Sequence, residues 1–177
     1  DHPKICPHTH LPLQSGSTQT LERMRRDYTA EEFLDVVHRL RDRIPHIALT
    51  TDVITGFCGE TEADFQATYD MMETVRFDAA FMFKYSPRSG TAAYKRLKDD
   101  VPEEEKGRRL TAIIDLQKKI SETKNQPYIG QTVNVLVEGQ SKRDADRLFG
   151  KTETFKTAIF PAQPGITAHT IVPVRIT

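Results

Sequence analysis

Residues 50–65, TTDVITGFCGETEADF, join a β-branched apolar run to a glycine-rich turn and then to the start of a helix. The apolar run ends near Gly56, and Thr61 can cap a helix whose apolar side chains recur at helical spacing: Phe65, Tyr69, Met72 and Val75. A strand, a short turn and a helix in this order make a βα unit. The stretch therefore predicts an α/β fold with a parallel sheet.

The same alternation of strands and helices extends from about residue 8 to residue 125. Thr29 and Glu32 have the spacing of a capping box, and Pro45 should end the helix that they start. Residues 47–54 and 79–86 are predicted to be buried strands. A long charged helix should run from Pro102 to Lys124. Its predicted core side chains are Leu110, Ile113, Ile114 and Ile120.

The composition changes near Pro127, beyond which short strands alternate with Gly, Pro and Asp turns. This pattern predicts a small antiparallel β-barrel, so we expect one domain over residues 1–126 and a second over 127–177. Cationic and aromatic side chains are interleaved in the second domain, as in barrels that bind RNA. The candidate RNA contacts there are Lys142, Arg143, Arg147, Lys151, Phe155 and Lys156. A solvated loop on a barrel that only packs on its neighbour is the alternative.

The bulk composition excludes some classes of protein. The 177 residues include 25 basic and 25 acidic side chains, so the chain is not a uniformly basic nucleic-acid binder. No apolar run approaches the ~18 residues of a membrane span, and we expect no membrane partner. Two cysteines are too few for a disulfide framework, which favours a reducing cytoplasm. The start, DHPK, has no initiator Met and no signal-peptide pattern, and is typical of a cut inside a longer protein.

The turn after residue 52 is a candidate ligand site. Asp52 stands at the carboxyl end of its strand, where active sites of α/β barrels lie, and glycine-rich turns before helices attract negative charge. Glu60 would repel a phosphate at this helix end, so a nucleoside or a zwitterion fits better. Gln14 and Ser15, at the end of another strand, suit a ribose, an amide or an adenine edge. An ordinary βα turn would explain the same motif.

A metal site is less well supported. Cys6, His8 and His10 alternate along the chain, with His2 nearby, so an extended strand would place the three on one face. We favour incidental positions for them and assign no metal ligands. No set of nucleophile, base and acid with recognisable local motifs is present, so composition alone identifies no reaction.

Five longer motifs, however, occur in an order that resembles one family. They are HLPLQSGS, LERMRRDYT, TTDVITGFCGETEADF, FMFKYSPRSGT and VPEEEKGRRL. Together they are similar to the second half of the MiaB-type tRNA methylthiotransferases, which are radical S-adenosylmethionine (SAM) enzymes, and the tail from Tyr128 resembles their TRAM domain. The resemblance implies the C-terminal part of a radical SAM partial (β/α) TIM-like barrel, followed by a small RNA-binding β-barrel.

The resemblance also implies a reaction. Enzymes of this family use SAM and two 4Fe–4S clusters, and a 5′-deoxyadenosyl radical abstracts hydrogen from C2 of an adenine that then receives a methylthio group. The motifs look most like the branch that modifies N6-isopentenyladenosine at position 37 of the tRNA anticodon stem-loop, with an external electron donor and a sulfur source. A threonylcarbamoyladenosine methylthiotransferase and a non-catalytic RNA-binding module are the alternatives.

Carried over residue by residue, the resemblance gives a set of expected contacts. Those to SAM are Gln14, Ser15, Asp52, Ile54, Gly56, Glu60 and Tyr85. Arg88 is expected near the RNA.

Two departures limit what this chain can do. The CxxxCxxC motif and three further cluster cysteines of the family are absent, so we assign no catalytic residue and expect the chain alone to be inactive. Cys58 stands where the family usually has Pro, which should loosen the turn and expose a thiol. A partial barrel also leaves a strand edge unpaired, so we expect an oligomer or a domain-swapped packing.

Overall fold

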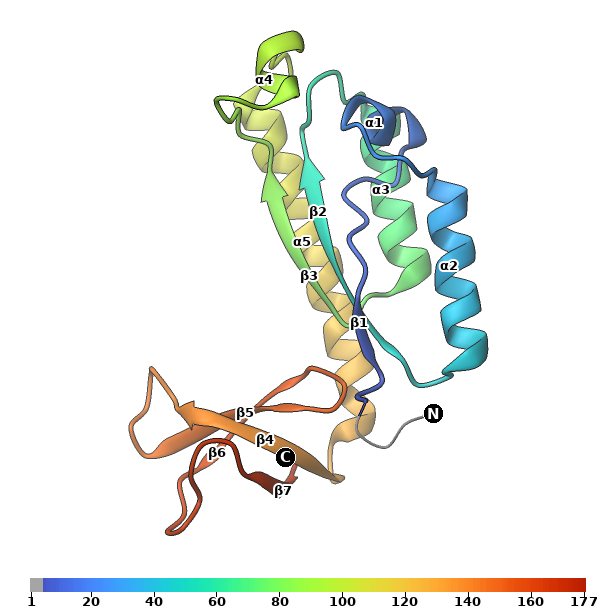
Figure 1. Ribbon diagram of the computed structural model, residues 1–177. Helices are drawn as coiled ribbons and strands as arrows, with labels where there is room; N and C mark the ends of the chain where they lie inside the picture. Colours follow the sequence, from blue (N-terminus) through green and yellow to red (C-terminus); the bar gives the residue numbers. More distant parts are fainter. Residues whose placement is uncertain (1–4) are drawn as a thin grey trace. The chain divides into compact units, whose positions relative to one another are not determined.

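The computed structural model describes residues 5–177, and the chain forms two compact units (Figure 1). We call residues 9–122 the α/β unit. The β unit comprises residues 123–177 together with the residues that end at His8. The domain limits expected at residues 126 and 127 stay a prediction for the longer protein.

The α/β unit contains one three-stranded sheet in the order β1-β2-β3. Its elements are β1 (His8–His10), α1 (Thr18–Arg23), α2 (Ala30–Arg43), β2 (Ala48–Thr55), α3 (Glu62–Val75), β3 (Ala79–Lys84), α4 (Ala92–Arg96) and α5 (Glu103–Asn125). Strands β2 and β3 pair in parallel with Thr50 opposite Ala79. Beyond β1, a parallel bridge joins Gln14 to Val53. The parallel α/β fold predicted from residues 50–65 is confirmed.

Local sequence signals fix the helix ends. Thr29 and Glu32 form the predicted capping box of α2, and the helix ends at Arg43, before Pro45. Helix α3 has the same arrangement, because the Thr61 side chain accepts from the Asp64 amide and the Asp64 carboxylate accepts from the Thr61 amide. Each such cap satisfies amides that the first helical turn leaves without partners.

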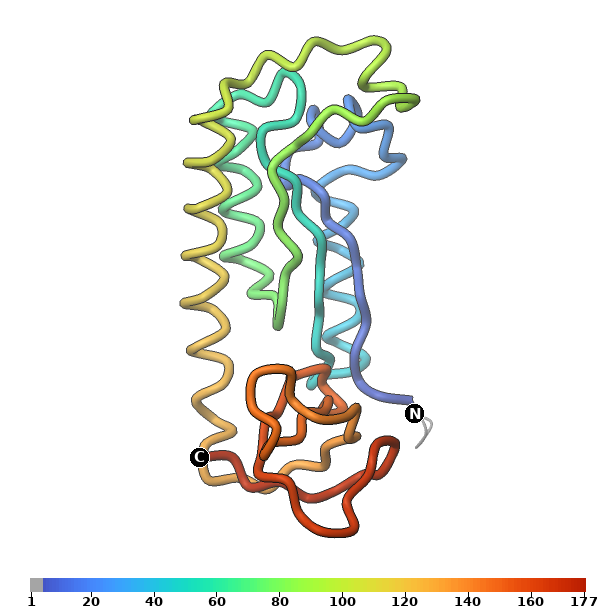
Figure 2. The backbone as a smooth tube through the Cα atoms, turned by 90° about the vertical axis from the view of Figure 1, so that its left-hand side faces the viewer, coloured from blue at the N-terminus to red at the C-terminus, as the bar shows by residue number. Residues whose placement is uncertain are grey.

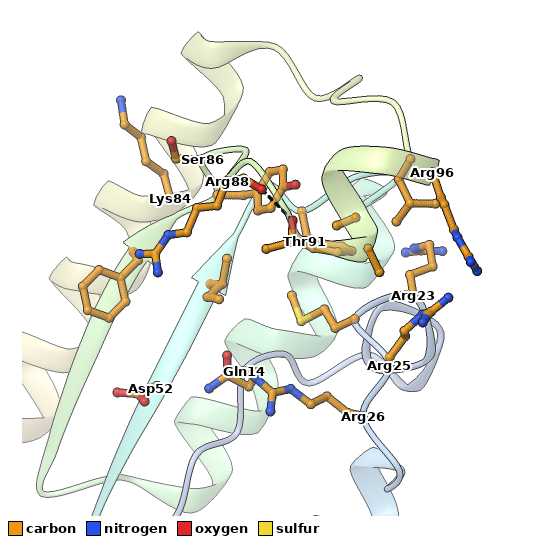
Figure 3. Close-up of a pocket in the computed structure, with 18 residues that line it drawn as sticks. Gln14, Arg23, Arg25, Arg26, Asp52, Lys84, Ser86, Arg88, Thr91 and Arg96 are labelled. Atoms are coloured by element: carbon orange, nitrogen blue, oxygen red, sulfur yellow. Dashed lines mark hydrogen bonds between the residues drawn. The ribbon is translucent and has the colours of Figure 1, made fainter.

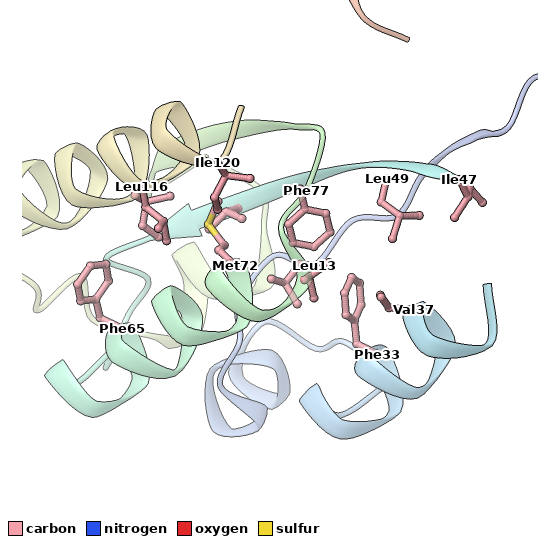
Figure 4. Close-up of a cluster of buried hydrophobic side chains, with 13 residues drawn as sticks. Leu13, Phe33, Val37, Ile47, Leu49, Phe65, Met72, Phe77, Leu116 and Ile120 are labelled. Carbon is pink, nitrogen blue, oxygen red and sulfur yellow. The ribbon is translucent and has the colours of Figure 1, made fainter. Parts of the chain in front are cut away.

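Three helices pack on one face of this sheet and enclose its core (Figure 4). Helix α3 lies between α2 and α5 in Figure 1, and its trace runs beside α5 in the turned view of Figure 2. Val37, Leu49, Met72 and Ile113 are fully buried in one apolar cluster that joins these helices to β2. Each side chain of this kind stabilises the fold by about 1.5–3 kcal/mol when it leaves water.

Two predictions about burial are wrong. Strand β3 is not buried, because Phe81 and Phe83 are 51% and 54% exposed on the sheet face away from the helices. On α5, Ile114 is 42% exposed, whereas Leu116 packs in the core with Ile113 and Ile120. Positions 113, 116 and 120 share one side of a 3.6-residue helix, and position 114 is turned about 100° away from position 113.

The β unit has a curled antiparallel sheet in the order β6-β5-β4-β7. Its elements are a 3₁₀ turn (Gln126–Tyr128), β4 (Thr132–Gln140), β5 (Arg147–Thr152), β6 (Thr157–Pro161) and β7 (Ile171–Arg175). Val135, Val137, Ala158 and Phe160 form its buried core. The register shifts between Val137 and Gly139, which marks a bulge in β4. The small antiparallel β fold predicted beyond Pro127 is confirmed.

Within residues 5–177, no helix combines the length and the apolar character needed to cross a membrane.

Candidate functional site

A cavity of about 630 Å³ lies in the α/β unit at the carboxyl ends of β2 and β3 (Figure 3). It brings together five of the residues that the sequence singled out, from three separate segments: Gln14, Asp52, Ile54, Tyr85 and Arg88. Its volume is in the range of small-molecule sites. The carboxyl ends of parallel strands are also where such folds place their ligands.

Gln14 is held more firmly than a loop residue usually is. Its amide donates to the Asp52 carbonyl at 2.8 Å, and its carbonyl accepts from the Ile54 amide at 2.9 Å. Its backbone adopts φ = 64°, a left-handed conformation that is uncommon outside glycine. The two hydrogen bonds fix the backbone that carries the Gln14 side chain at the cavity wall (Figure 3).

Ser15, Gly56 and Glu60 do not line this cavity. The Ser15 hydroxyl is buried and hydrogen-bonds with that of Thr68 at 3.1 Å. Glu60 Oε1 accepts from the Gly56 amide at 2.8 Å and from Arg109 Nη1 at 2.7 Å. Burial raises the pKa of Glu60, although the hydrogen bonds from Gly56 and Arg109 oppose this shift. These three residues bond to other parts of the protein, and Gly56 and Glu60 stabilise the turn between β2 and α3.

The N-terminus of α3 is capped by the Asp64 carboxylate, which also contacts side chains of α1. Asp64 accepts from the Ser17 hydroxyl, from the amide and hydroxyl of Thr61, and from Arg23. Burial raises the pKa of Asp64, but these hydrogen bonds outweigh it and hold the pKa at about 2. The carboxylate is therefore charged at neutral pH and neutralises the positive end of α3.

Tyr85 forms one wall with its ring. The ring meets that of Phe57 edge-on at 4.8 Å between centroids, and Lys106 Nζ lies 5.4 Å from its centre. Burial, together with a hydrogen bond to the Cys58 thiol, raises the pKa of Tyr85 to about 12, so its phenol stays protonated at neutral pH. The exposed thiol expected at Cys58 is wrong, because the residue is 3% exposed.

His10 extends the site along the open face of the sheet. Its Nε2 lies 3.4 Å from Asp52 Oδ2, and its Nδ1 lies 3.0 Å from the hydroxyl of Thr50. The ring of Phe81 approaches it edge-on at 6.0 Å. From the sequence, His10 was considered only for a metal site that we did not favour. In the structure its Nε2 lies within ion-pair distance of a cavity carboxylate.

The described residues do not fit an iron–sulfur cluster. Among residues 5–177 no three His, Cys, Asp or Glu side chains are grouped as metal ligands. Cys6 is exposed and Cys58 is buried, and these are the two cysteines of the sequence. His2, which was considered with them, lies outside the described residues.

The number of basic side chains around the cavity was not expected from the sequence, which had singled out Arg88 alone. Six line the cavity, with Asp52 as the single acidic residue of the lining: Arg23, Arg25, Arg26, Lys84, Arg88 and Arg96. The run RMRRD at residues 23–27 was a usable signal, because three arginines within four residues form a local charge cluster in a chain of zero net charge.

In the β unit, the candidate RNA contacts separate into two groups at opposite ends of β5. Lys142 and Arg143 are exposed in the turn before β5, and Arg147 pairs with Asp144 at 3.1 Å. At the other end of β5, Lys151 Nζ lies 4.3 Å from the centre of the exposed Phe155 ring in the turn that follows. In the same turn, Lys156 Nζ lies 5.3 Å from the ring of Tyr128. A β-strand of this length separates the two groups by roughly 15 Å.

Comparison with known proteins agrees with both units. The family model of the Radical SAM superfamily matches residues 3–72, and that of the TRAM domain matches residues 126–177. A tRNA-2-methylthio-N(6)-dimethylallyladenosine synthase of Chlorobium chlorochromatii is 48% identical over all 177 residues, which cover 39% of its length. A protein of the same name from Moorella thermoacetica is 50% identical over 98% of the chain and 39% of its own length. A third, from Bacteroides thetaiotaomicron, is 52% identical over 89% of the chain and 35% of its length.

Among solved structures, coproporphyrinogen III oxidase of Escherichia coli, described as a radical SAM enzyme, is similar to 69% of the chain and to 27% of its own. The TM-score is 0.48 and the identity 20%. The present chain spans about two fifths of the length of the curated relatives that it matches. Since relatives of this name are 48–52% identical over 89–100% of the chain, which has a radical SAM segment followed by a TRAM domain, the chain belongs to the MiaB-type family of tRNA methylthiotransferases.

Proposed function

We propose that this chain is the part of a tRNA-modifying enzyme that holds SAM and tRNA while C2 of N6-isopentenyladenosine at position 37 is methylthiolated. The observation that carries the proposal is the cavity, because it collects Gln14, Asp52, Ile54 and Tyr85 at the carboxyl ends of two parallel strands. The names of the relatives, at 48–52% identity, support the choice of substrate. We place the reaction in the cytoplasm.

The donor set of the cavity suits SAM. Gln14 offers an amide donor and acceptor, Asp52 a carboxylate, and Ile54 an apolar surface against which an adenine can lie. The protonated phenol of Tyr85 can donate a hydrogen bond, and an arginine can pair with the carboxylate of the methionine part. When bound, SAM supplies the adenosyl group that takes hydrogen from the adenine.

The residues of this chain have the task of binding and orientation. The Asp52 carboxylate lies at the cavity, with His10 Nε2 at 3.4 Å from its Oδ2, and can accept hydrogen bonds from a ligand. Residues 5–177 do not fit a cluster. We propose that parts of the protein outside this chain hold the two clusters, and that an external electron donor and a sulfur source act with them. The anticodon stem-loop is the proposed RNA partner of the basic groups beside β5.

The direct test is SAM binding by this chain. Equilibrium dialysis with labelled SAM should show binding that Gln14→Ala and Asp52→Ala each weaken about 10-fold, as expected when a hydrogen bond to a charged or buried group is lost. Glu31→Ala is the control, because its exposed side chain lies outside the cavity. Equal affinity of all four proteins would contradict the assignment of the cavity.

The activity is tested in a chimera. The matching segment of the Chlorobium chlorochromatii relative is replaced by this chain, and the tRNA is analysed for 2-methylthio-N6-isopentenyladenosine. We expect product with the wild-type segment and at least ~10-fold less with Asp52→Ala. Product on threonylcarbamoyladenosine instead would support the alternative branch of the family.

The chain alone should be inactive. After reconstitution with iron and sulfide it should release no 5′-deoxyadenosine from SAM, because its two cysteines cannot supply the three thiolates that a cluster of this kind needs. Release of 5′-deoxyadenosine above the level of a Cys6→Ser/Cys58→Ser control would overturn this prediction.

A further inference from the structure

Four arginines around the cavity have no ion pair within residues 5–177: Arg25, Arg26, Arg88 and Arg96. The other two basic side chains of the lining are paired, Arg23 with Asp64 and Lys84 with Glu103. All four arginines are exposed. In Figure 3 Arg25, Arg26 and Arg96 are drawn on one side of the cavity, and Arg88 on the other.

This concentration of charge exceeds what SAM requires. One carboxylate occupies one or two guanidinium groups, and the sulfonium and ammonium groups of SAM are themselves positive. Asp52 is the single acidic side chain of the lining, and it already has His10 as its partner. Four like charges on one rim of a chain with zero net charge repel one another unless an anion of higher charge lies between them.

We propose that these four arginines bind consecutive phosphates of the RNA strand on either side of the target nucleotide; the proposal rests on the function given above. Guanidinium groups match phosphate oxygens with two parallel hydrogen bonds, and arginine is the usual residue for this purpose. Arginine side chains also stack on unpaired bases, which single-stranded loops expose. The cavity between them then receives the base.

The rim has an apolar inner side that suits this arrangement. Met24, Phe83 and Leu97 line the same cavity, with the ring of Phe83 54% exposed. Phosphates would therefore contact the arginines, and the aromatic face of a base would pack on the apolar side chains of the lining. RNA would be held at two places in the chain, by the arginine rim of the α/β unit and by the basic turns of the β unit.

The test measures the salt dependence of RNA binding by fluorescence anisotropy, with a labelled RNA hairpin of anticodon-arm sequence. The rim variant is Arg25→Gln/Arg26→Gln/Arg88→Gln/Arg96→Gln. A matched control removes four exposed charges that do not line the cavity: Arg39→Gln/Arg43→Gln/Lys118→Gln/Lys119→Gln. A third variant, Lys142→Gln/Arg143→Gln/Lys151→Gln, addresses the β unit.

The rim variant should bind about 10- to 100-fold more weakly near 150 mM salt, and its salt slope should fall by ~3, since each phosphate contact in a single strand contributes about 0.7. The control should keep both values. Circular dichroism of each variant shows that the fold is retained.

The remaining outcomes separate the two proposals. An unchanged slope in the rim variant, with a lowered slope in the β-unit variant, overturns the arginine rim and leaves the proposed function intact. Absence of hairpin binding by the wild-type chain contradicts both. If the rim variant loses SAM in equilibrium dialysis but binds the hairpin as before, the arginines serve the SAM carboxylate, and the RNA assignment is wrong.

Discussion

Gly16 allows the loop after β1 to approach the backbone of α3 closely. Its amide donates to the Thr68 hydroxyl at 2.9 Å, and a Cβ at this position would lie 2.7 Å from the Thr68 Cα and close to the Ala67 carbonyl oxygen. These are backbone atoms of α3, which cannot turn aside as a side chain could. The loop that carries Gln14 can therefore dock on α3 only with glycine here.

Gly16→Ala should lower the free energy of unfolding by about 1–3 kcal/mol, the usual cost of forcing an atom into a packed site. The measurement is urea denaturation followed by circular dichroism. Gly107→Ala is the matched control, because nothing lies within 4 Å of a Cβ there and the residue is inside α5. That change should raise stability by up to ~1 kcal/mol through helix propensity. A neutral Gly16→Ala would mean that the loop is not tied to α3.

Asp64 should make the stability of the α/β unit depend on pH in the acid range. Its pKa in the folded chain is about 2, below the ordinary value of 3.8. A lowered folded pKa contributes stability that is present above about pH 4 and lost as the pH falls towards 2. The contribution should be about 2 kcal/mol. In urea denaturation between pH 5 and pH 2, wild type should lose more stability than Asp64→Asn. Asp35→Asn, whose side chain is 67% exposed, should behave like wild type.

At the scale of elements, α5 clamps the turn between β2 and α3. Arg109 is 6% exposed at its side chain and pairs with the buried Glu60 at 2.7 Å. Its neighbour Arg108 is half exposed and pairs with Glu62 and Glu105. The two arginines are adjacent in sequence, but a step of 100° along the helix places one inside and the other at the surface.

Arg109→Met should lower the free energy of unfolding by about 3–5 kcal/mol, because it leaves the Glu60 carboxylate buried with the Gly56 amide but without its charged partner. Arg108→Met should have little effect, since exposed ion pairs contribute little. Adding Glu60→Gln to Arg109→Met should recover part of the loss, and a double-mutant cycle in urea measures the coupling. Equal effects of Arg108→Met and Arg109→Met would contradict the clamp.

In α5, apolar periodicity predicts the helix and part of its buried face, but not the burial of its charged side chains. The helix itself follows from its length and charge pattern, and Ile113 and Ile120 were placed correctly in the core. Lys106 and Arg109 are buried although they are charged. Their partners Asp99 and Glu60 lie 7 and 49 residues away in sequence, and local spacing carries no information about the second of these.

Only the part of the candidate site that lies at strand ends could be predicted from the sequence. Asp52 and Ile54 lie at a strand end that the apolar pattern marks, and Gln14 follows another strand. The rim arginines come from segments around residues 25, 88 and 96, which only the folded chain brings to one cavity. A sum of charges near zero gives no sign of such a local excess.

At the scale of the whole molecule, the sheet of the α/β unit has β1 and β3 at its edges within the described part of the chain. Unpaired strand edges with exposed aromatic side chains favour association. We expect the mass from light scattering to rise with concentration, and Phe81→Lys to suppress this rise because it adds charge to the β3 edge. Tyr94→Lys, a change at a similarly exposed ring on α4, is the control. A constant monomer mass at high concentration would contradict this prediction.

The double attachment of Gln14 has a consequence for the thermodynamics of ligand capture. Because its amide and carbonyl are both bonded to β2, the conformational entropy of this wall is lost during folding and not during binding. Residues 86–97, which also line the cavity, are exposed over most of their length, and the backbone hydrogen bonds described for them join residues at most four apart in sequence. A ligand would therefore meet one preorganised side at once, and the entropic cost of recognition would fall on the segment that carries Arg88 and Arg96.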